Sequence, residues 1–174
     1  MFRRRFGTAA IAVLLAAFIA RPAQADWLES VTGKDPGLLE VGGGMFDFLH
    51  NYKAGEARVE YQFAHGLFFL HPIVGAFGTT KGGGFGYAGF NLDLHITQHL
   101  IVAPTASMGY YAKGSGKDLG GPFEFKTGAQ FAYRFRDDSR IGIQFDHISN
   151  AGIYKKNPGE ENLILMFTFP VGSL

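Results

Sequence analysis

The chain has no cysteine among its 174 residues, so no disulfide can stabilise it and no thiol can act as a nucleophile or metal ligand. Charge is also scarce: Asp, Glu, Lys and Arg make up 18% of the chain, and the formal net charge is +1. Because nucleic-acid-binding proteins carry basic stripes, we expect no nucleic-acid partner. Beyond the first 25 residues no apolar run approaches the roughly 20 residues that a spanning helix needs.

The first 25 residues have the three parts of a secretory signal peptide. Three arginines at positions 3 to 5 precede an apolar run over 9–20, and Ala23, Gln24 and Ala25 form a small-residue cleavage site. Cleavage after Ala25 leaves an exported domain over 26–174. Removal of the signal peptide also removes four arginines, so 12 basic residues remain against 15 acidic ones and the formal charge becomes −3.

The mature segment has the composition of a β protein, with most of the 25 Gly, 18 Phe and 7 Tyr of the chain and many runs of period two. It predicts a single domain of eight strands. Their expected ranges are 38–48, 56–63, 67–77, 85–96, 100–112, 123–135, 140–149 and 161–170. An exported domain without disulfides must draw its stability from this sheet.

Alternation of apolar and polar residues gives each strand two distinct faces. In the strand over 123–135, Phe123, Phe131 and Tyr133 share one side while Glu124 and Lys126 take the other. A soluble sandwich alternates in the same way. Strand length, aromatic density and the leader together favour an all-β fold, an eight-stranded antiparallel transmembrane β-barrel of the outer-membrane type.

The charged residues assigned to the inner face have both signs. They are Arg58, Glu60, Asp93, Glu124, Lys126, Arg134 and Asp146. An eight-stranded barrel is just wide enough to be filled by side chains, so we expect these charges to pair rather than line a channel.

Loop lengths predict the orientation of the barrel. The expected connections after the second, fourth and sixth strands are short, and those after the first, third, fifth and seventh are longer and carry Gly, Lys and Asn. Short periplasmic turns and long external loops are typical of outer-membrane barrels. The seventh strand then ends at the external rim of the outer membrane.

The segment 146–162 contains the residue types of a serine esterase. His147 and Ser149 are two positions apart on one strand face, so an imidazole nitrogen can reach the serine oxygen. Glu161 opens the next strand, and parity places all three side chains on the lipid-facing side. Such a grouping can activate a serine for attack on an ester.

This segment resembles the outer-membrane lipid A 3-O-deacylases, the PagL-like family. The likeness rests on the His-x-Ser-Asn pattern, the residues after it, a loop motif and the downstream glutamate. These are His147, Ser149, Asn150, Ala151, Gly152, Asn157, Pro158, Gly159 and Glu161. The resemblance implies hydrolysis of the ester-linked acyl chain at position 3 of lipid A, with lipopolysaccharide and membrane lipids as partners in the outer membrane.

Under this hypothesis Ser149 is the nucleophile, His147 the general base and then acid, and Glu161 the carboxylate that orients the imidazole. Glu160 competes for the last role, but parity and the family spacing favour Glu161. Asn150, through its side chain or backbone, and the backbone at Gly152 are candidates for holding the oxyanion. Alternation turns Asn150 away from Ser149 unless the strand has already ended. We expect no metal and no cofactor.

Other polar groups carry weaker signals. His95 and His99 have a metal-like spacing of four, but a turn interrupts them, so a structural role is favoured. The glycines at 82–84 indicate an external hairpin rather than a phosphate loop. Four loop lysines could meet lipopolysaccharide phosphates, although solvated loop charge is the commoner explanation. They are Lys113, Lys117, Lys155 and Lys156.

Two other functions remain open on the sequence alone. One is an outer-membrane phospholipase, with or without calcium, that would share the serine and histidine. The other is a structural or adhesin barrel without enzymatic activity, in which the three residues are incidental. The sequence likewise leaves open whether the protein forms a homodimer.

Overall fold

The computed structural model describes residues 36–64, 66 and 70–171. The expected signal peptide over 1–25 lies outside these residues. In the described ranges no helix is long and apolar enough to cross a membrane.

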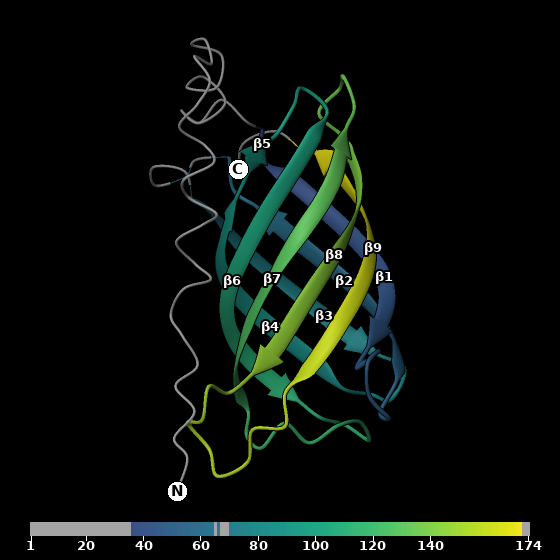
Figure 1. Cartoon of the computed structure of the whole chain (residues 1–174), viewed down its shortest axis with the longest axis vertical. Coiled ribbons are helices and arrows are strands. Elements are labelled where there is room, and N and C mark those ends of the chain that lie inside the picture. Colours follow the sequence, from purple (N-terminus) through teal and green to yellow (C-terminus); the bar gives the residue numbers. More distant parts are fainter. Residues whose placement is uncertain (1–35, 65, 67–69, 172–174) are drawn as a thin grey trace, which may run out of the picture.

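The described residues form one antiparallel sheet closed into a barrel (Figure 1). Closure follows from two pairings, β1 with β9 and β4 with β6, which leave no long strand with a free edge. The strands are β1 Leu38–Phe46, β2 Ala54–Gln62, β3 Leu70–Thr79, β4 Gly84–Leu92, β5 Leu94–His95, β6 Leu100–Ala112, β7 Phe123–Arg134, β8 Arg140–Ser149 and β9 Glu160–Pro170.

The nine segments make eight barrel strands. β5 continues β4 after a one-residue break at Asp93, because both pair with β6 in the same register: Asn91 faces Thr105 and Leu94 faces Val102. The predicted eight-stranded barrel is therefore confirmed. The ranges predicted for β6 and β8 match those observed, and no other end among the described residues differs by more than two residues. The predicted start of the third strand, over 67–69, lies outside the described residues.

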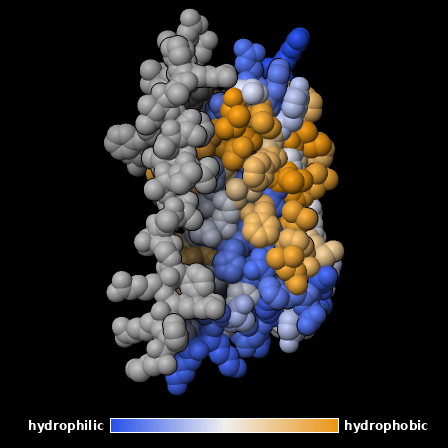
Figure 2. Space-filling model, viewed as in Figure 1, coloured by the Kyte–Doolittle hydropathy of each residue, from blue (hydrophilic) through white to orange (hydrophobic). Residues whose placement is uncertain are grey.

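The outer wall of the barrel is apolar, as the alternation predicts. On β7, Phe131 and Tyr133 are exposed while Glu124 and Lys126 are fully buried inside. The apolar side chains in Figure 2 form a band across the visible wall, and hydrophilic residues gather at its lower end and at its upper tip. Exposed apolar side chains facing outward and buried charges facing inward are the arrangement of a barrel that sits in lipid.

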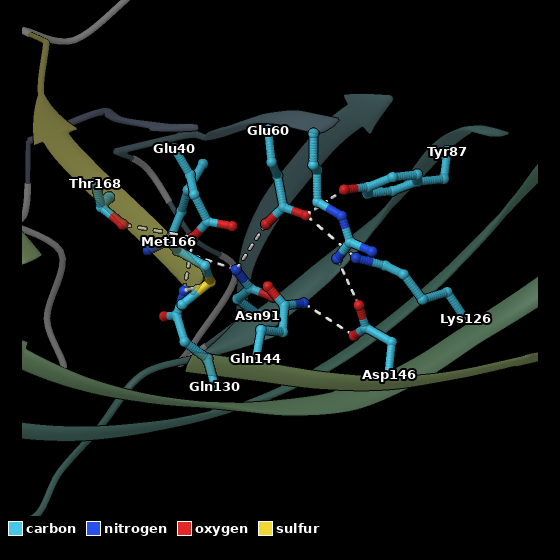
Figure 3. Close-up of polar contacts among 12 residues, drawn as sticks. Glu40, Glu60, Tyr87, Asn91, Lys126, Gln130, Gln144, Asp146, Met166 and Thr168 are labelled. Atoms are coloured by element: carbon cyan, nitrogen blue, oxygen red, sulfur yellow. Dashed lines mark hydrogen bonds and ion pairs between the residues drawn. The ribbon is translucent and has the colours of Figure 1, made fainter. Parts of the chain in front are cut away.

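Ion pairs and hydrogen bonds join most of the charges that were expected inside the barrel (Figure 3), whereas Glu124 is buried without an ion pair among the described residues. Arg58 bonds Asp146 at 2.5 Å and Glu56 at 2.7 Å. Lys126 lies 3.3 Å from Glu60. Nearer the end of the barrel that carries the β7–β8 turn, Arg140 bonds Asp93 at 2.8 Å and Gln130 bonds Glu40 at 2.6 Å. The network ties β1, β2, β7 and β8 to one another, and to Asp93 just after β4, across the interior. Arg134, also expected inside, instead pairs with Asp138 in the turn after β7 and is partly exposed.

Loss of one member of the buried network should destabilise the barrel. Asp146→Ala leaves the Arg58 guanidinium buried with Glu56 as its remaining ion-pair partner, and breaking a buried pair costs about 3–5 kcal/mol. We expect a lower urea midpoint for unfolding from detergent micelles. The matched control is Lys113→Ala, which removes an exposed pair with Asp118 and should cost about 0–1 kcal/mol. Equal midpoints for the two variants would contradict the prediction.

The loops that were expected to be external lie together at the lower end of the barrel in Figure 1. They are the connections 47–53, 80–83, 113–122 and 150–159. One prediction about them is wrong: the β3–β4 connection is a four-residue turn, not a longer loop. Glycines at 78 and 84 pair across the hairpin and extend both strands, and Thr79 N–H then bonds the Gly83 carbonyl at 2.8 Å.

Candidate active site

His147 and Glu161 face each other on neighbouring strands. They are direct partners in the β8–β9 register, and His147 Nδ1 lies 3.2 Å from Glu161 Oε1 in a hydrogen bond. Both side chains are on the outer wall: His147 is 43% exposed, whereas the Glu161 carboxylate is only 17% exposed. A proton on Nδ1 is thereby directed to the carboxylate, which leaves Nε2 as the basic nitrogen.

Ser149 lies two residues beyond His147, at the last position of β8 and on the same face. Its side chain is partly exposed, and no hydrogen bond among the described residues uses its Oγ. A serine oxygen that is accessible, on the same strand face as an imidazole and without another partner among the described residues can be approached by an ester.

Asn150 does not present its amide to Ser149. It is fully buried, and its Nδ2 donates to the carbonyls of Leu119 at 2.7 Å and Lys156 at 2.8 Å. Its Oδ1 accepts from Gly152 N–H at 3.0 Å. The amide therefore joins the β6–β7 and β8–β9 loops. The side-chain oxyanion role considered for Asn150 has no free donor in this geometry, and the Gly152 N–H is engaged as well.

Asn157 lies beside the peptide that follows Ser149. Its Oδ1 accepts from Asn150 N–H at 3.0 Å, which fixes the orientation of the Asn157 amide. Its Nδ2 makes no hydrogen bond within the described part of the chain, and the residue is exposed. A fixed amide with a free donor is thus next to the serine, a feature that spacing alone did not assign.

Gly159 packs directly against the imidazole of His147. Its backbone has φ of +61°, a conformation that L side chains rarely adopt, and a Cβ at this position would lie 2.8 Å from Cε1 and 3.4 Å from Nε2 of His147. The loop backbone therefore limits how far the ring can move. This contact gives the Asn157-Pro158-Gly159 turn a physical role at the site.

Gly159→Ala should impair the site without unfolding the barrel. The added methyl group forces either the loop or the His147 ring to move, and a displacement of about 1 Å at a reacting group can cost on the order of a hundredfold in rate. Turnover of lipopolysaccharide in mixed micelles measures the loss. Gly152→Ala is the control, because Gly152 also has positive φ but a Cβ added there would meet no atom within 4 Å. A smaller loss for Gly159→Ala than for Gly152→Ala would refute the packing argument.

Glu160 and Glu161 point to opposite sides of the wall. Glu160 is fully buried, and its Oε2 accepts from the backbone N–H of Asp47 at 3.2 Å. Glu161 lies outside with His147. The preference for Glu161 over Glu160 that parity gave agrees with the geometry.

The other polar candidates lie elsewhere. His99 bonds the Arg134 carbonyl at the opposite rim, and His95 is in β5. Lys117 is buried and bonds Asp47 at 2.6 Å, so it is structural rather than a solvated loop charge. Lys113 is 3.7 Å from Asp118, whose pKa is lowered by the Gly120 backbone N–H and by Lys113.

A surface hollow lies next to the site, at the end of the barrel that was predicted to be external. Its lining includes the exposed Lys156, the buried Lys117 and the amide of Asn157. The lining residues are Tyr52, Lys117, Asp118, Lys156, Asn157 and Pro158. A second hollow is at the opposite rim around His99 and Arg136, away from His147.

Comparison with known families assigns the chain. The family model for lipid A 3-O-deacylase (PagL) matches residues 44–170, which include β2 to β9 and every residue of the candidate site. The chain belongs to the lipid A 3-O-deacylase (PagL) family. Among solved structures it is similar to the outer membrane enzyme PagL, with a TM-score of 0.57 and 14% identity over 77% of this chain and 99% of that one. Comparison with curated proteins gave no match.

Family membership confirms the predicted resemblance and the class of enzyme, a carboxylic ester hydrolase of the lipid A 3-O-deacylase type. The fold is an outer-membrane-type β-barrel like that of PagL. The structural or adhesin alternative without enzymatic activity is therefore not retained. A homodimer gains no support from either comparison.

Sequence reasoning missed two contributions to the site. His50, in the β1–β2 loop, lies 3.0 Å from Glu161, and Asp47 of the same loop lies 3.3 Å from His50. These contacts join the loop after β1, the first strand, to β9, the last strand. The residues that they join are about 110 positions apart in the chain. A periodicity signal within one strand carries no information about such a pair.

Proposed function

We propose that the protein is an outer-membrane serine esterase that removes the ester-linked 3-O acyl chain of lipid A through Ser149, His147 and Glu161. The observation that carries the proposal is the hydrogen bond of 3.2 Å between His147 Nδ1 and Glu161 Oε1, on the lipid-facing wall and next to a free serine. The family match supports the substrate class.

In the proposed reaction, His147 Nε2 takes the proton of Ser149 as Oγ attacks the acyl carbonyl carbon. The tetrahedral intermediate collapses, and His147 returns the proton to the departing 3-hydroxyl oxygen of the sugar. Water, deprotonated by the same imidazole, then attacks the acyl-serine, and the imidazole returns this proton to Ser149 Oγ as the bond to the fatty acid breaks. Glu161 stabilises the imidazolium at both stages and holds its tautomer.

We infer that Asn157, rather than the Asn150 side chain, supplies a side-chain donor for the oxyanion. Asn150 uses both amide hydrogens to hold two loops, whereas the Asn157 amide is fixed through its oxygen and keeps its Nδ2 hydrogens free. The backbone N–H of Ala151, two residues after the serine, is a further candidate donor. Losing one donor of this kind typically costs on the order of a hundredfold in rate.

The position of the three residues favours a substrate that arrives sideways from the membrane. The side chains share the outer face with Phe145 and Leu163, which are exposed. Acyl chains can lie against this apolar wall, while the sugar and phosphate groups remain at the rim near the exposed Lys156. A lumen site would require the opposite strand parity.

Mass spectrometry of the lipid products tests the proposal. Purified protein is incubated with lipopolysaccharide and, separately, with glycerophospholipid, each with EDTA or with added calcium. Loss of a single 3-hydroxy acyl chain from lipid A in EDTA is expected. Calcium-dependent formation of lysophospholipid, with lipid A unchanged, would instead identify the phospholipase alternative.

A further inference from the structure

Only one of the two Glu161 oxygens is used by His147. Oε1 carries that hydrogen bond, whereas Oε2 is buried and accepts no aligned hydrogen bond from the described residues. The imidazole of His50 approaches Oε2, with its Nδ1 3.0 Å away. Glu161 therefore lies between two histidines, one on each oxygen.

The loop that carries His50 is held firmly. Asp47 is fully buried with φ of 54°, and its carboxylate accepts from Lys117 Nζ at 2.6 Å and from Tyr52 N–H at 2.9 Å. His50 Nδ1 lies 3.3 Å from the same carboxylate. A residue held in the left-handed region persists only where the surroundings fix it. His50 thus projects from an ordered base, although its own side chain is 49% exposed.

This loop is also bonded to the strand that carries Glu161. Phe48 N–H donates to the Glu161 carbonyl at 3.0 Å, and Asp47 N–H donates to Glu160 Oε2 at 3.2 Å. The spacing between the His50 loop and the Glu161 backbone is therefore set by the main chain. A carboxylate fixed at its backbone, hydrogen-bonded through Oε1 and contacted by an imidazole at Oε2 has little freedom to rotate away from His147.

A divalent cation could be considered for the same three groups. The ligand atoms of Asp47, His50 and Glu161 lie within 4.8 Å of one another. However, Lys117 Nζ already occupies Asp47 Oδ1, the same oxygen that faces His50. A metal ion there would be forced against an ammonium group. The imidazole is the better partner for Glu161.

We propose that His50 is a positioning residue that fixes the Glu161 carboxylate through Nδ1, so that Oε1 stays aligned with His147. The proposal rests on the proposed function, because the carboxylate matters to catalysis only if His147 acts as the base. His50 lies on the far side of Glu161 from His147, so it affects the chemical step rather than substrate binding. Loss of the His50 side chain should therefore lower kcat and change KM little.

The test compares His50→Ala with His50→Asn by steady-state kinetics on lipopolysaccharide in mixed micelles. Asparagine places its Nδ2 donor close to the position of the histidine Nδ1, whereas alanine has no donor. We expect kcat to fall on the order of tenfold for His50→Ala and to recover at least in part for His50→Asn. Asn51→Ala, an exposed neighbour in the same loop, is the matched control and should leave kcat unchanged.

Heat-modifiable migration in gels verifies that each variant is a folded barrel. A kcat within twofold of wild type for folded His50→Ala would overturn the inference, and so would an His50→Asn variant no better than alanine. A rise in KM without a loss of kcat would assign His50 to substrate binding and also overturn it. Failure of the proposed function looks different, because wild-type protein would then release no acyl chain from lipid A.

Discussion

Ser149→Ala should reduce the release of the 3-O acyl chain by on the order of a thousandfold or more, the largest effect expected for any single change. Alanine removes the oxygen that would form the acyl-enzyme, while His147 and Glu161 keep their hydrogen bond. The released 3-hydroxy fatty acid, quantified by mass spectrometry, gives the rate directly.

The loss should occur without a change in folding, because no hydrogen bond of the described residues depends on Ser149 Oγ. Thr127→Ala is the matched control: Thr127 is the direct partner of His147 across the β7–β8 pair and also has an exposed hydroxyl group. It should remain active. Full activity in folded Ser149→Ala would exclude Ser149 as the nucleophile. Inactivation by Thr127→Ala alone would assign that role to Thr127.

Glu161→Gln is expected to have the second largest effect, a decrease in kcat of about a hundredfold to ten-thousandfold. The amide is similar in size but carries no charge, so it cannot stabilise the imidazolium that forms as Ser149 loses its proton. It can also present its NH₂ group to His147 and favour the wrong tautomer. Steady-state kinetics at fixed pH measure the loss.

The neighbouring Glu160→Gln provides the control. Glu160 points into the barrel and accepts from Asp47 N–H, and a glutamine oxygen can accept the same bond. We expect nearly unchanged kcat. The reverse result, an active Glu161→Gln beside an inactive Glu160→Gln, would mean that the orienting carboxylate acts from the interior.

Much of the architecture is predictable from the sequence because one face of each strand contacts lipid and the other contacts the polar interior of the barrel. Phe131 and Tyr133 had to face lipid once Glu124 and Lys126 were assigned inside, and the same parity placed His147 beside Glu161. Local alternation was sufficient there, since strands that follow each other in sequence are paired as antiparallel neighbours.

The errors arose where contacts between distant segments decide the outcome. Alternation correctly turned Asn150 inward, but only the folded loops show that its amide hydrogens hold Leu119 and Lys156. Lys117 lies in a loop, yet it is buried because Asp47 pairs with it. The β3–β4 loop was predicted too long because glycines, read as loop residues, also fit the close spacing of paired strands.

The pairing of β1 with β9, which closes the barrel, affects when the enzyme can act. Glu161 lies on the last strand, and the loop that packs against it follows the first strand. An incompletely assembled chain, with β1 and β9 still apart, lacks these contacts even if the β8–β9 hairpin has formed. We therefore expect full activity to develop only when the barrel closes in the membrane that holds its substrate.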